Sequence, residues 1–229
     1  MNRLVVAIDG PAGSGKSTVS RILAKRLGVP HLDTGAYYRA TTLAVLRAGI
    51  DVSDHEAVVT VASTARIEPI DGRMTLEGED VEEEIRDPAT TAAVSAVSAI
   101  PAVRAVMVDA QRSWVATHGN KAVVEGRDIG TVVFPDAEVK VFLTADPDER
   151  ARRRAAERGE QVDRHLEAIR LRDTYDSSRA ASPLRPSEDA EMVDTTGQTI
   201  EEVIERIVGM ISKIDQRSSV GDQPEGRLP

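Results

Sequence analysis

The chain has 229 residues, of which 41% are hydrophobic and 3% aromatic, which suits one α/β domain with a core of valine, isoleucine, leucine and alanine. It has no cysteine, which excludes a disulfide framework and a thiolate metal site. The net charge of −9 argues against a general nucleic-acid-binding protein, and no apolar run approaches membrane-spanning length. The first strand begins without a signal sequence, so we expect a cytoplasmic protein with no nucleic-acid or membrane partner.

An apolar segment followed by a glycine-rich loop comes first in the chain. Residues 4–8 (LVVAI) show no polar alternation, which predicts a strand buried on both faces of a parallel sheet. Residues 10–17 (GPAGSGKS) match G-x-x-x-x-G-K-[ST] at every fixed position. An amphipathic helix that ends at Gly28 follows. Strand, loop and helix therefore come in the order that a phosphate-binding loop requires.

The chemistry of this loop predicts a nucleoside triphosphate site. Its glycines let backbone N–H groups point inward at phosphates, and the N-terminus of the helix adds partial positive charge. Lys16 supplies a full charge for the β- and γ-phosphates, and the Ser17 hydroxyl is the expected Mg²⁺ ligand. A glycine-rich turn that matches by chance is the alternative, and the flanking strand and helix argue against it. The predicted triphosphate-binding residues are Gly10, Pro11, Ala12, Gly13, Ser14, Gly15, Lys16, Ser17 and Thr18.

The next segment predicts a second strand and a helix. Residues 29–33 are short and apolar and end in a carboxylate. Thr34 can cap a helix that begins near Ala36 and ends at Gly49. Arg39 lies in the first turns of this helix, just downstream of a strand end, where the ligands of open α/β sheets gather. Arg39 is therefore a candidate ligand-binding residue.

A small β insertion then interrupts the αβ alternation. The capping-box motif S-x-x-E at 53–56 predicts a helix over about 54–65. Residues 66–70 and 73–77 predict two short strands joined by a type I′ turn at Asp-Gly, and 81–85 predicts a third strand. The many acidic residues of this insertion are more typical of a solvated face than of a metal site.

Helices and strands alternate again in the rest of the chain. In order, the pattern predicts a helix from Ala89 up to Pro101, a helix from Pro101 to about Thr117, strands over 121–125, 138–144 and 191–194, and a last helix over 200–214. Residues 215–229 are polar and rich in Ser, Gly and Pro, so we expect a disordered tail that activity does not need.

The segment between the last two strands is the most charged part of the chain. Its arginines outnumber its lysines, and arginine offers the bidentate fork that suits phosphate. Two arginine-rich helices on either side of Gly159 predict a lid that closes on the phosphates. A nucleic-acid patch is the alternative, and the acidic net charge argues against it. The arginines are Arg150, Arg152, Arg153, Arg154 and Arg158 before Gly159, and Arg164, Arg170, Arg172, Arg179 and Arg185 after it.

The phosphate-binding loop alone does not separate switch GTPases, motor ATPases and small-molecule kinases. The chain has no guanine-reading N-K-x-D motif and no apolar strand that ends in an Asp-Glu pair. Its cationic groups are spread over four segments: Arg39, Arg104, Arg127 and the set from Arg150 to Arg179. A kinase of a phosphorylated acceptor needs such a spread because it holds a second anion. Kinases of other small acceptors, such as UMP, shikimate or a sugar, and a P-loop regulatory or nucleic-acid-binding ATPase remain as alternatives.

Four stretches resemble bacterial cytidylate (CMP) kinases. They are LDTGAYYRA at 32–40, EGEDVEEEIR at 77–86, EGRDIGTVVFPDAEVKVFL at 125–143 and RDTYDSSRAASPL at 172–184. The resemblance extends over about residues 4–212. It implies a P-loop NTPase-type core of five parallel strands with helices on both faces, an acceptor-binding arm enlarged by a small antiparallel β insertion, and an arginine-rich lid.

The resemblance implies transfer of the γ-phosphoryl group from ATP, with Mg²⁺, to CMP or dCMP. It places Thr34, Arg39, Arg127 and Arg179 around the acceptor phosphate, Ser95, Arg104 and Asp128 at the cytosine edge, and Arg172 and Asp176 at the sugar. The catalytic set that it implies is Lys16, Arg127, Arg154, Arg158 and Arg179. The acceptor phosphate is already ionised, so we expect Asp128 to bind rather than to act as a base. Two departures from the family pattern are Glu125, where EGRD replaces DGRD, and Thr34 in place of serine.

The resemblance also implies how the chain is divided. We expect a monomer with one domain over 1–214 and a tail over 215–229. Within that domain, the core covers 1–50, 116–149 and 180–214, the acceptor-binding arm about 51–115, and the lid about 150–179.

Overall fold

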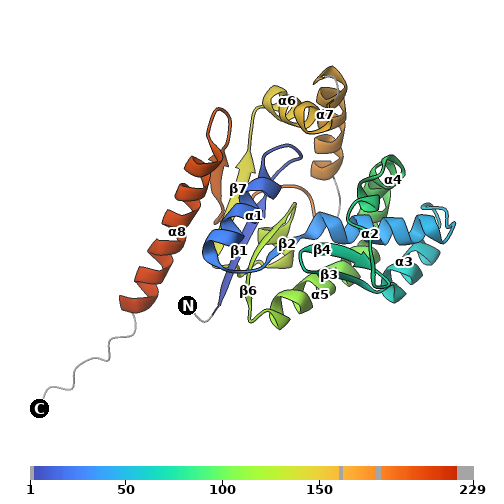
Figure 1. The fold of residues 1–229 in the computed structure, drawn as a ribbon, viewed down its shortest axis with the longest axis horizontal. Helices are drawn as coiled ribbons and strands as arrows, with labels where there is room; N and C mark the ends of the chain where they lie inside the picture. Colours follow the sequence, from blue (N-terminus) through green and yellow to red (C-terminus); the bar gives the residue numbers. More distant parts are fainter. Residues whose placement is uncertain (1–2, 160–161, 179–181, 221–229) are drawn as a thin grey trace, which may run out of the picture.

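A computed structural model of the chain describes residues 3–159, 162–178 and 182–220. A five-stranded parallel sheet lies at its centre in the order β2-β6-β1-β7-β8, with helices on both faces (Figure 1). This architecture confirms the predicted fold class. The strands are β1 (Leu4–Asp9), β2 (His31–Asp33), β6 (Lys121–Gly126), β7 (Val139–Thr144) and β8 (Glu191–Asp194).

The central strand β1 has no polar face because both of its faces are covered. Val5 and Ala7 belong to one hydrophobic cluster, and Val6 and Ile8 belong to another on the opposite side of the sheet. Successive side chains of a strand point to opposite faces, so an uninterrupted apolar run is what two packed layers require. The run 4–8 therefore predicted a buried strand correctly.

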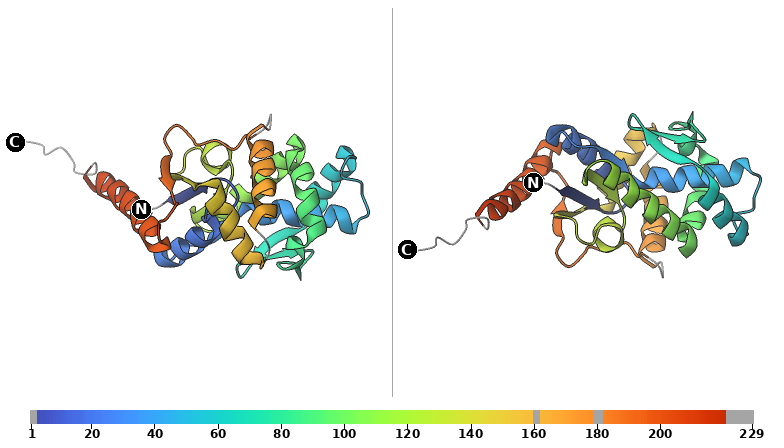
Figure 2. Two further views of the ribbon diagram at one scale, coloured as in Figure 1. Left: turned by 90° about the horizontal axis from the view of Figure 1, so that it is seen from above. Right: turned by 90° about the horizontal axis from the view of Figure 1, so that it is seen from below.

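The helices form the two outer layers. They are α1 (Lys16–Leu27), α2 (Thr34–Arg47), α3 (His55–Thr64), α4 (Pro88–Ala99), α5 (Pro101–Thr117), α6 (Pro147–Arg158), α7 (Val162–Ser178) and α8 (Ile200–Val220). Helices α1 and α8 lie side by side and cover one face, whereas α2 to α5 belong to the cluster on the other face (Figure 2). Within the described residues, no single helix is long and apolar enough to span a membrane, although α4 and α5, bent by 98°, pass that test as a pair.

The β insertion forms a separate antiparallel sheet of β3 (Ile67–Ile70), β4 (Arg73–Leu76) and β5 (Glu79–Asp80). Positive φ angles at Asp71 (51°) and Gly72 (77°) confirm the type I′ turn. The predicted third strand over 81–85 is wrong. A second tight turn at Glu77 (φ 53°) and Gly78 (φ 83°) reverses the chain earlier, and residues 84–86 form a 3₁₀ turn, η1.

Many acidic residues of the insertion are paired with arginines. Arg47 contacts Glu79 and Glu84, Arg73 contacts Asp80, and Arg86 contacts Glu82. These pairs tie the insertion to α2 and to itself. Within the described part of the chain, no group of three or more His, Cys, Asp or Glu side chains could hold a metal ion.

The caps of α2 and α3 differ from the predicted ones by one residue. Asp33 caps α2 by accepting from the Ala36 amide at 3.2 Å, while the Thr34 hydroxyl, the predicted cap, donates to the backbone oxygen of Glu125. Asp54 caps α3, because Ser53 of the predicted capping box donates to Asp51 instead. In both places an aspartate next to the predicted hydroxyl is an equally good cap, and the hydroxyl has another partner.

The last helix, α8, is longer than predicted. It continues past the expected end at Ile214 to Val220. No glycine or proline occurs between Gly209 and Gly221, so nothing in this polar stretch interrupts the backbone hydrogen bonds of the helix. The first part of the predicted tail, 215–220, is therefore helical, and residues 221–229 lie outside the described residues.

Asp9 joins the first strand to the loop that follows β6. Its two carboxylate oxygens accept hydrogen bonds from the amides of Ile129 and Gly130 at 2.8 and 2.7 Å. These amides begin a π-helical turn, η2 (Ile129–Val133), immediately after Arg127 and Asp128. The bonds fix this loop beside the end of β1. Burial raises the pKa of Asp9 to about 6, although both hydrogen bonds favour the charged form.

The free energy of unfolding should therefore fall as Asp9 ionises. Because its pKa is about 6 in the folded protein and 3.8 ordinarily, the folded state holds the proton more tightly than the unfolded chain. This preference stabilises the fold below about pH 4 and is lost as the pH rises through about 6. We therefore expect the free energy of unfolding of the wild type to fall by about 3 kcal/mol between these limits. Asp9→Asn cannot ionise and should not show this fall.

Urea unfolding of both proteins over this pH range tests this prediction. Asparagine offers one acceptor oxygen where aspartate offers two, so the variant should also show a constant loss of stability that does not depend on pH. Identical pH slopes for the two proteins would contradict the prediction.

Candidate active site

The glycine-rich loop lies between β1 and α1, at the carboxyl end of the sheet. Gly10, Gly13 and Gly15 all have positive φ angles, of 149°, 78° and 88°. A Cβ atom on Gly10 would lie 2.1 Å from the backbone oxygen of Leu143 in β7, so no larger residue fits there. The predicted strand–loop–helix context is confirmed. The amides of the loop and of the first turn of α1 therefore form an anion-binding end of the helix.

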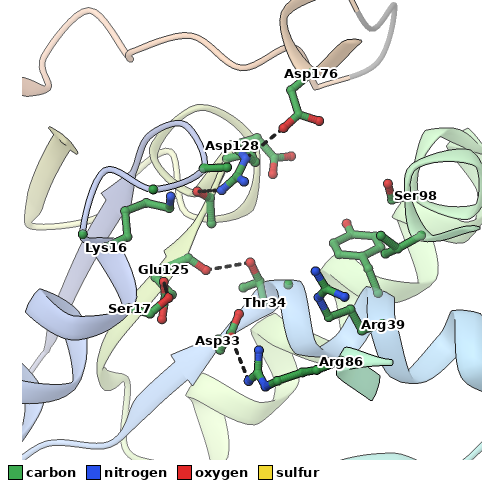
Figure 3. Close-up of a pocket in the computed structure, with 18 of the residues that line it drawn as sticks. Lys16, Ser17, Asp33, Thr34, Arg39, Arg86, Ser98, Glu125, Asp128 and Asp176 are labelled. Atoms are coloured by element: carbon green, nitrogen blue, oxygen red, sulfur yellow. Dashed lines mark hydrogen bonds and ion pairs between the residues drawn. The ribbon is translucent and has the colours of Figure 1, made fainter. Parts of the chain in front are cut away.

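Lys16 is held across this loop. Its side chain is buried, and Nζ donates to the backbone oxygen of Pro11 at 2.7 Å. Lys16, Ser17 and Thr18 line a cavity that continues from the loop toward α2 and α4 (Figure 3). The lysine charge is thus fixed at the loop end of the cavity rather than extended into solvent.

The first lid helix, α6, packs directly on the glycine-rich loop. The buried Arg150 donates to the backbone oxygen of Ala12 at 3.2 Å and pairs with Asp173 of α7 at 2.7 Å. Arg153 donates to the backbone oxygen of Thr195, just after β8, at 2.8 Å. Both arginines fasten the lid to the core. Because their guanidinium groups bond to the protein itself, we distinguish these two arginines from those that line the cavity.

The other arginines predicted for the lid differ in how far the structure describes them. Arg154 lines the cavity. The side chains of Arg158 and Arg172 lie outside the described part of the structure, although the backbone of each is helical. Arg179 lies wholly outside the described residues.

Glu125 connects several parts of the site. It is the penultimate residue of β6, the parallel neighbour of β1, and lies opposite Ile8 in the register. Its carboxylate accepts from the Ser17 hydroxyl at 2.7 Å and lies 2.9 Å from His31 Nε2. Its backbone oxygen accepts from the Thr34 hydroxyl at 2.7 Å. Glu125 therefore contacts the glycine-rich loop, β2 and the start of α2 at once.

Of the two neighbouring carboxylates Glu125 and Asp33, the surroundings favour the charged form of Glu125. Burial alone raises the pKa of Glu125, but the nearby His31, Lys16 and Ser17 outweigh burial and bring that pKa below its usual range. Burial and the charge of Glu125 raise the pKa of the adjacent Asp33. Glu125 is thus the carboxylate that keeps its charge beside Ser17.

No role for Glu125 was predicted from the sequence. ATPase motifs place an Asp-Glu pair at the end of an apolar strand, whereas KAVVEG has a single acid before its final glycine. The signal was nevertheless present, since the acid directly follows a buried run. The pairing of β6 with β1 brings this acid to Ser17.

The same cavity contains a buried ion pair. Arg104 of α5 is 5% exposed and Asp128 is 4% exposed, and Arg104 Nη2 bonds to an oxygen of Asp128. The other terminal nitrogen, Nη1, donates to the backbone oxygen of Ser98 at 3.2 Å, and the guanidinium carbon lies 5.1 Å from the centre of the Tyr38 ring. Two opposite charges are therefore fixed side by side in a pocket with one aromatic wall.

The structure brings most predicted acceptor residues to one cavity. Thr34, Arg39, Arg104, Arg127, Asp128 and Asp176 all line it. Arg127 Nε pairs with Asp176 at 3.0 Å, and Arg39 donates to Thr91 at 3.0 Å. Among the described residues, the lining includes Ser98 rather than the predicted Ser95. The backbone oxygen of Ser95 accepts from the Tyr175 hydroxyl of α7 at 3.0 Å.

The cavity has a charge opposite to that of the whole chain. Six cations (Lys16, Arg39, Arg86, Arg104, Arg127 and Arg154) and four acids (Asp33, Glu125, Asp128 and Asp176) are among its lining residues. The difference is a formal charge of +2, against −9 for the chain. Arg86 was not predicted, and it lies 3.8 Å from Asp33. The cationic excess suits a cavity that collects anionic ligands.

Comparisons with known proteins agree with this geometry. The family model of cytidylate kinase matches residues 6–213. A cytidylate kinase from Rhodococcus opacus is 50% identical over 95% of this chain and 97% of its own, and one from Mycobacterium leprae is 52% identical over 93% and 97%. One from Pelotomaculum thermopropionicum is 49% identical over 90% and 95%.

Solved structures support the fold. A gluconokinase from Sinorhizobium meliloti has a TM-score of 0.51 at 14% identity, covering 97% of this chain and 98% of its own. An uncharacterised protein from Eubacterium ventriosum has a TM-score of 0.54 at 13% identity, covering 92% and 99%. At these identities the likeness concerns the arrangement of helices and strands. The family match and the relatives at about half identity over nearly the whole length show that the chain belongs to the cytidylate kinase family.

Proposed function

We propose that this protein transfers the γ-phosphoryl group of ATP to CMP or dCMP, giving CDP or dCDP and ADP. The observation that carries the proposal is one cavity that is lined both by residues of the phosphate-binding loop and by the buried Arg104–Asp128 pair. The family supports the same reaction. Neither the family nor the cavity favours the alternative acceptors or a regulatory ATPase.

The lining of the cavity suits both substrates. The loop amides and Lys16 would hold the β- and γ-phosphates of ATP at the N-terminus of α1. Thr34, Arg39 and Arg127 line the same cavity, where they would hold the acceptor phosphate for the transferred group. Transfer between two anions depends on positioning and charge neutralisation, which fixed cations provide. No general base is needed, because the acceptor phosphate is already ionised near neutral pH.

The Arg104–Asp128 pair suits the pairing edge of cytosine. Asp128 can accept from the N4 amino group, and Arg104 can donate to the O2 or N3 acceptors. Uracil would place a carbonyl oxygen against the carboxylate instead. In a buried site such a mismatch leaves polar groups unpaired, which disfavours UMP. Ser95 and Ser98 are both proposed contacts from α4, and Asp176 is a proposed contact for the sugar.

Ser17 and Glu125 also suit Mg²⁺. Their hydroxyl and carboxylate oxygens lie 2.7 Å apart beside the loop, and oxygen ligands of this kind are what Mg²⁺ prefers. Mg²⁺ held there would neutralise part of the charge of the ATP phosphates. Ser17 would bind the ion directly, and Glu125 would orient its shell. No further carboxylate is needed, because Mg²⁺ keeps several water ligands.

We extend the proposal to the division of the chain and its setting. The arm over about 51–115 and the lid over about 150–179 would close on the core over 1–50, 116–149 and 180–214, within one domain over 1–214. Closure would exclude water and suppress ATP hydrolysis. The hydrogen bond from Tyr175 in the lid to Ser95 in the arm supports this closure. We further propose a monomer in the cytoplasm with no nucleic-acid or membrane partner.

The fate of the γ-phosphoryl group tests the transfer directly. We incubate the protein with ATP labelled at the γ-phosphate, Mg²⁺ and CMP, and separate the products. The label should appear in the β-phosphate of CDP, with one ADP formed for each CDP. Release of the label as inorganic phosphate, whether or not CMP is present, would contradict the proposal and favour an ATPase.

A further inference from the structure

His31 extends the contacts of Glu125 toward the edge of the sheet. It begins β2, and it pairs with Val123 of β6 in the parallel register that also sets Asp33 opposite Glu125. His31 Nε2 lies 2.9 Å from Glu125 Oε1, and the Ser17 hydroxyl donates to Glu125 Oε2 at 2.7 Å. A chain of three side chains therefore runs from β2 through β6 to the first turn of α1.

This arrangement fixes both oxygens of one carboxylate. Glu125 has three rotatable side-chain bonds, and its side chain is 3% exposed. The Thr34 hydroxyl holds the backbone of Glu125 but does not determine how its carboxylate is turned. Ser17 lies on one side of that carboxylate and His31 on the other. Without His31, one oxygen loses its partner and the carboxylate can rotate away from Ser17.

We propose that His31 is a positioning residue, whose Nε2–H holds the Glu125 carboxylate in the orientation that serves Ser17 and the Mg²⁺ bound with ATP. The proposal rests on the Mg²⁺ site proposed above. Groups that orient metal-binding carboxylates and hydroxyls change metal affinity by about 10–100-fold when they are removed. His31 would therefore act on the metal-dependent part of ATP binding and leave the other contacts of ATP unchanged.

Two variants separate this role from a merely structural one. The amide nitrogen of His31→Gln falls near the position of Nε2 and can still donate to Glu125. The side chain of His31→Asn is equally polar, but it is one methylene shorter and does not reach. The side chain of His31 is 19% exposed, so both amides fit without burying a new polar group. His55→Asn, at the exposed first position of α3, is the matched control.

The measurement is the affinity for a non-hydrolysable ATP analogue, by calorimetry, once with Mg²⁺ and once with a chelator. The ratio of the two dissociation constants is the gain due to the metal. We expect His31→Asn to reduce this gain by about 10-fold or more, while His31→Gln and His55→Asn retain it. The affinity of His31→Asn measured with the chelator should stay within about twofold of wild type. A purely structural role would instead weaken binding equally under both conditions.

Three results would overturn the proposal. A wild-type gain in His31→Asn would show that His31 does not act on the metal site. An equal loss in His31→Gln and His31→Asn would show that a donor at this position is not what matters. The absence of any Mg²⁺ gain in wild type would remove the metal site itself, whereas CDP formation, which is measured separately, would still stand or fall on its own.

Discussion

Replacing Lys16 by alanine should lower the turnover number of phosphoryl transfer by about 10³-fold or more and leave the fold intact. Lys16 Nζ is fixed at the loop by the Pro11 backbone oxygen, at the cavity end where the γ-phosphoryl group would develop charge. A preorganised charge in a partly enclosed site contributes more to the transition state than an exposed one would. Steady-state kinetics with saturating ATP and CMP measures the loss.

The control for this variant is Lys25→Ala. Lys25 lies on the same helix, α1, but it is exposed in the last turn. Its removal should change neither turnover nor thermal unfolding beyond the small effects usual for surface positions. Turnover of Lys16→Ala within tenfold of wild type, with the fold intact, would refute the role of Lys16 in the transfer.

Replacing Asp128 by asparagine should change which base the enzyme accepts. The variant has the same shape, but its amide can donate to the O4 carbonyl of uracil, whereas the carboxylate repels it. It also leaves the buried Arg104 without its counter-charge. We expect the ratio of kcat/KM for CMP to that for UMP to fall by about 10²-fold, most of it through a loss with CMP.

Competition kinetics with both nucleotides measures this ratio. Asp71→Asn is a suitable control, since Asp71 is exposed in a turn whose positive φ asparagine also tolerates. Asp128→Asn should also be less stable than wild type, because Arg104 is 5% exposed. An unchanged CMP-to-UMP ratio in the folded variant would show that Asp128 does not recognise the base, whatever happens to overall activity.

The parts of the fold that local patterns govern were predictable. The run LVVAI and the loop after it carry their own signals, because a strand buried on both faces has to be apolar and the loop needs glycines. The Asp-Gly turn of the insertion was equally clear. By contrast, the register of β1 against β6, which places Glu125 beside Ser17, depends on residues more than 100 positions apart in the chain.

The wrong predictions concern residues for which two local structures are equally favourable. At these positions, a contact with a distant part of the chain decides which structure forms. Asp33 and Thr34 are both good helix caps, and the backbone oxygen of Glu125 engages Thr34, so Asp33 becomes the cap. Arg150 and Arg154 look alike in the sequence, yet one is tied to the glycine-rich loop and the other lines the cavity. The sequence around Asp9 does not indicate its hydrogen bonds to η2, because these bonds form only when the sheet brings the two segments together.

The residues that bind the acceptor were predicted from the family resemblance and not from local sequence patterns. Arg104 alone is an ordinary helical arginine, and only its buried pair with Asp128 distinguishes it in the structure. Family motifs led to both residues, and to Ser95. They did not lead to Ser98, whose place in the cavity follows from the way α4 packs.

The central claim is that the cavity selects cytidine monophosphates as acceptors of the γ-phosphoryl group. The most direct measurement is ADP release from ATP and Mg²⁺ by the purified protein with CMP, dCMP, UMP, AMP, GMP or no acceptor. CMP and dCMP should stimulate release far above every other condition. Equal release with and without each nucleotide would contradict the claim, and stimulation by UMP or AMP instead would overturn the roles given to Arg104 and Asp128.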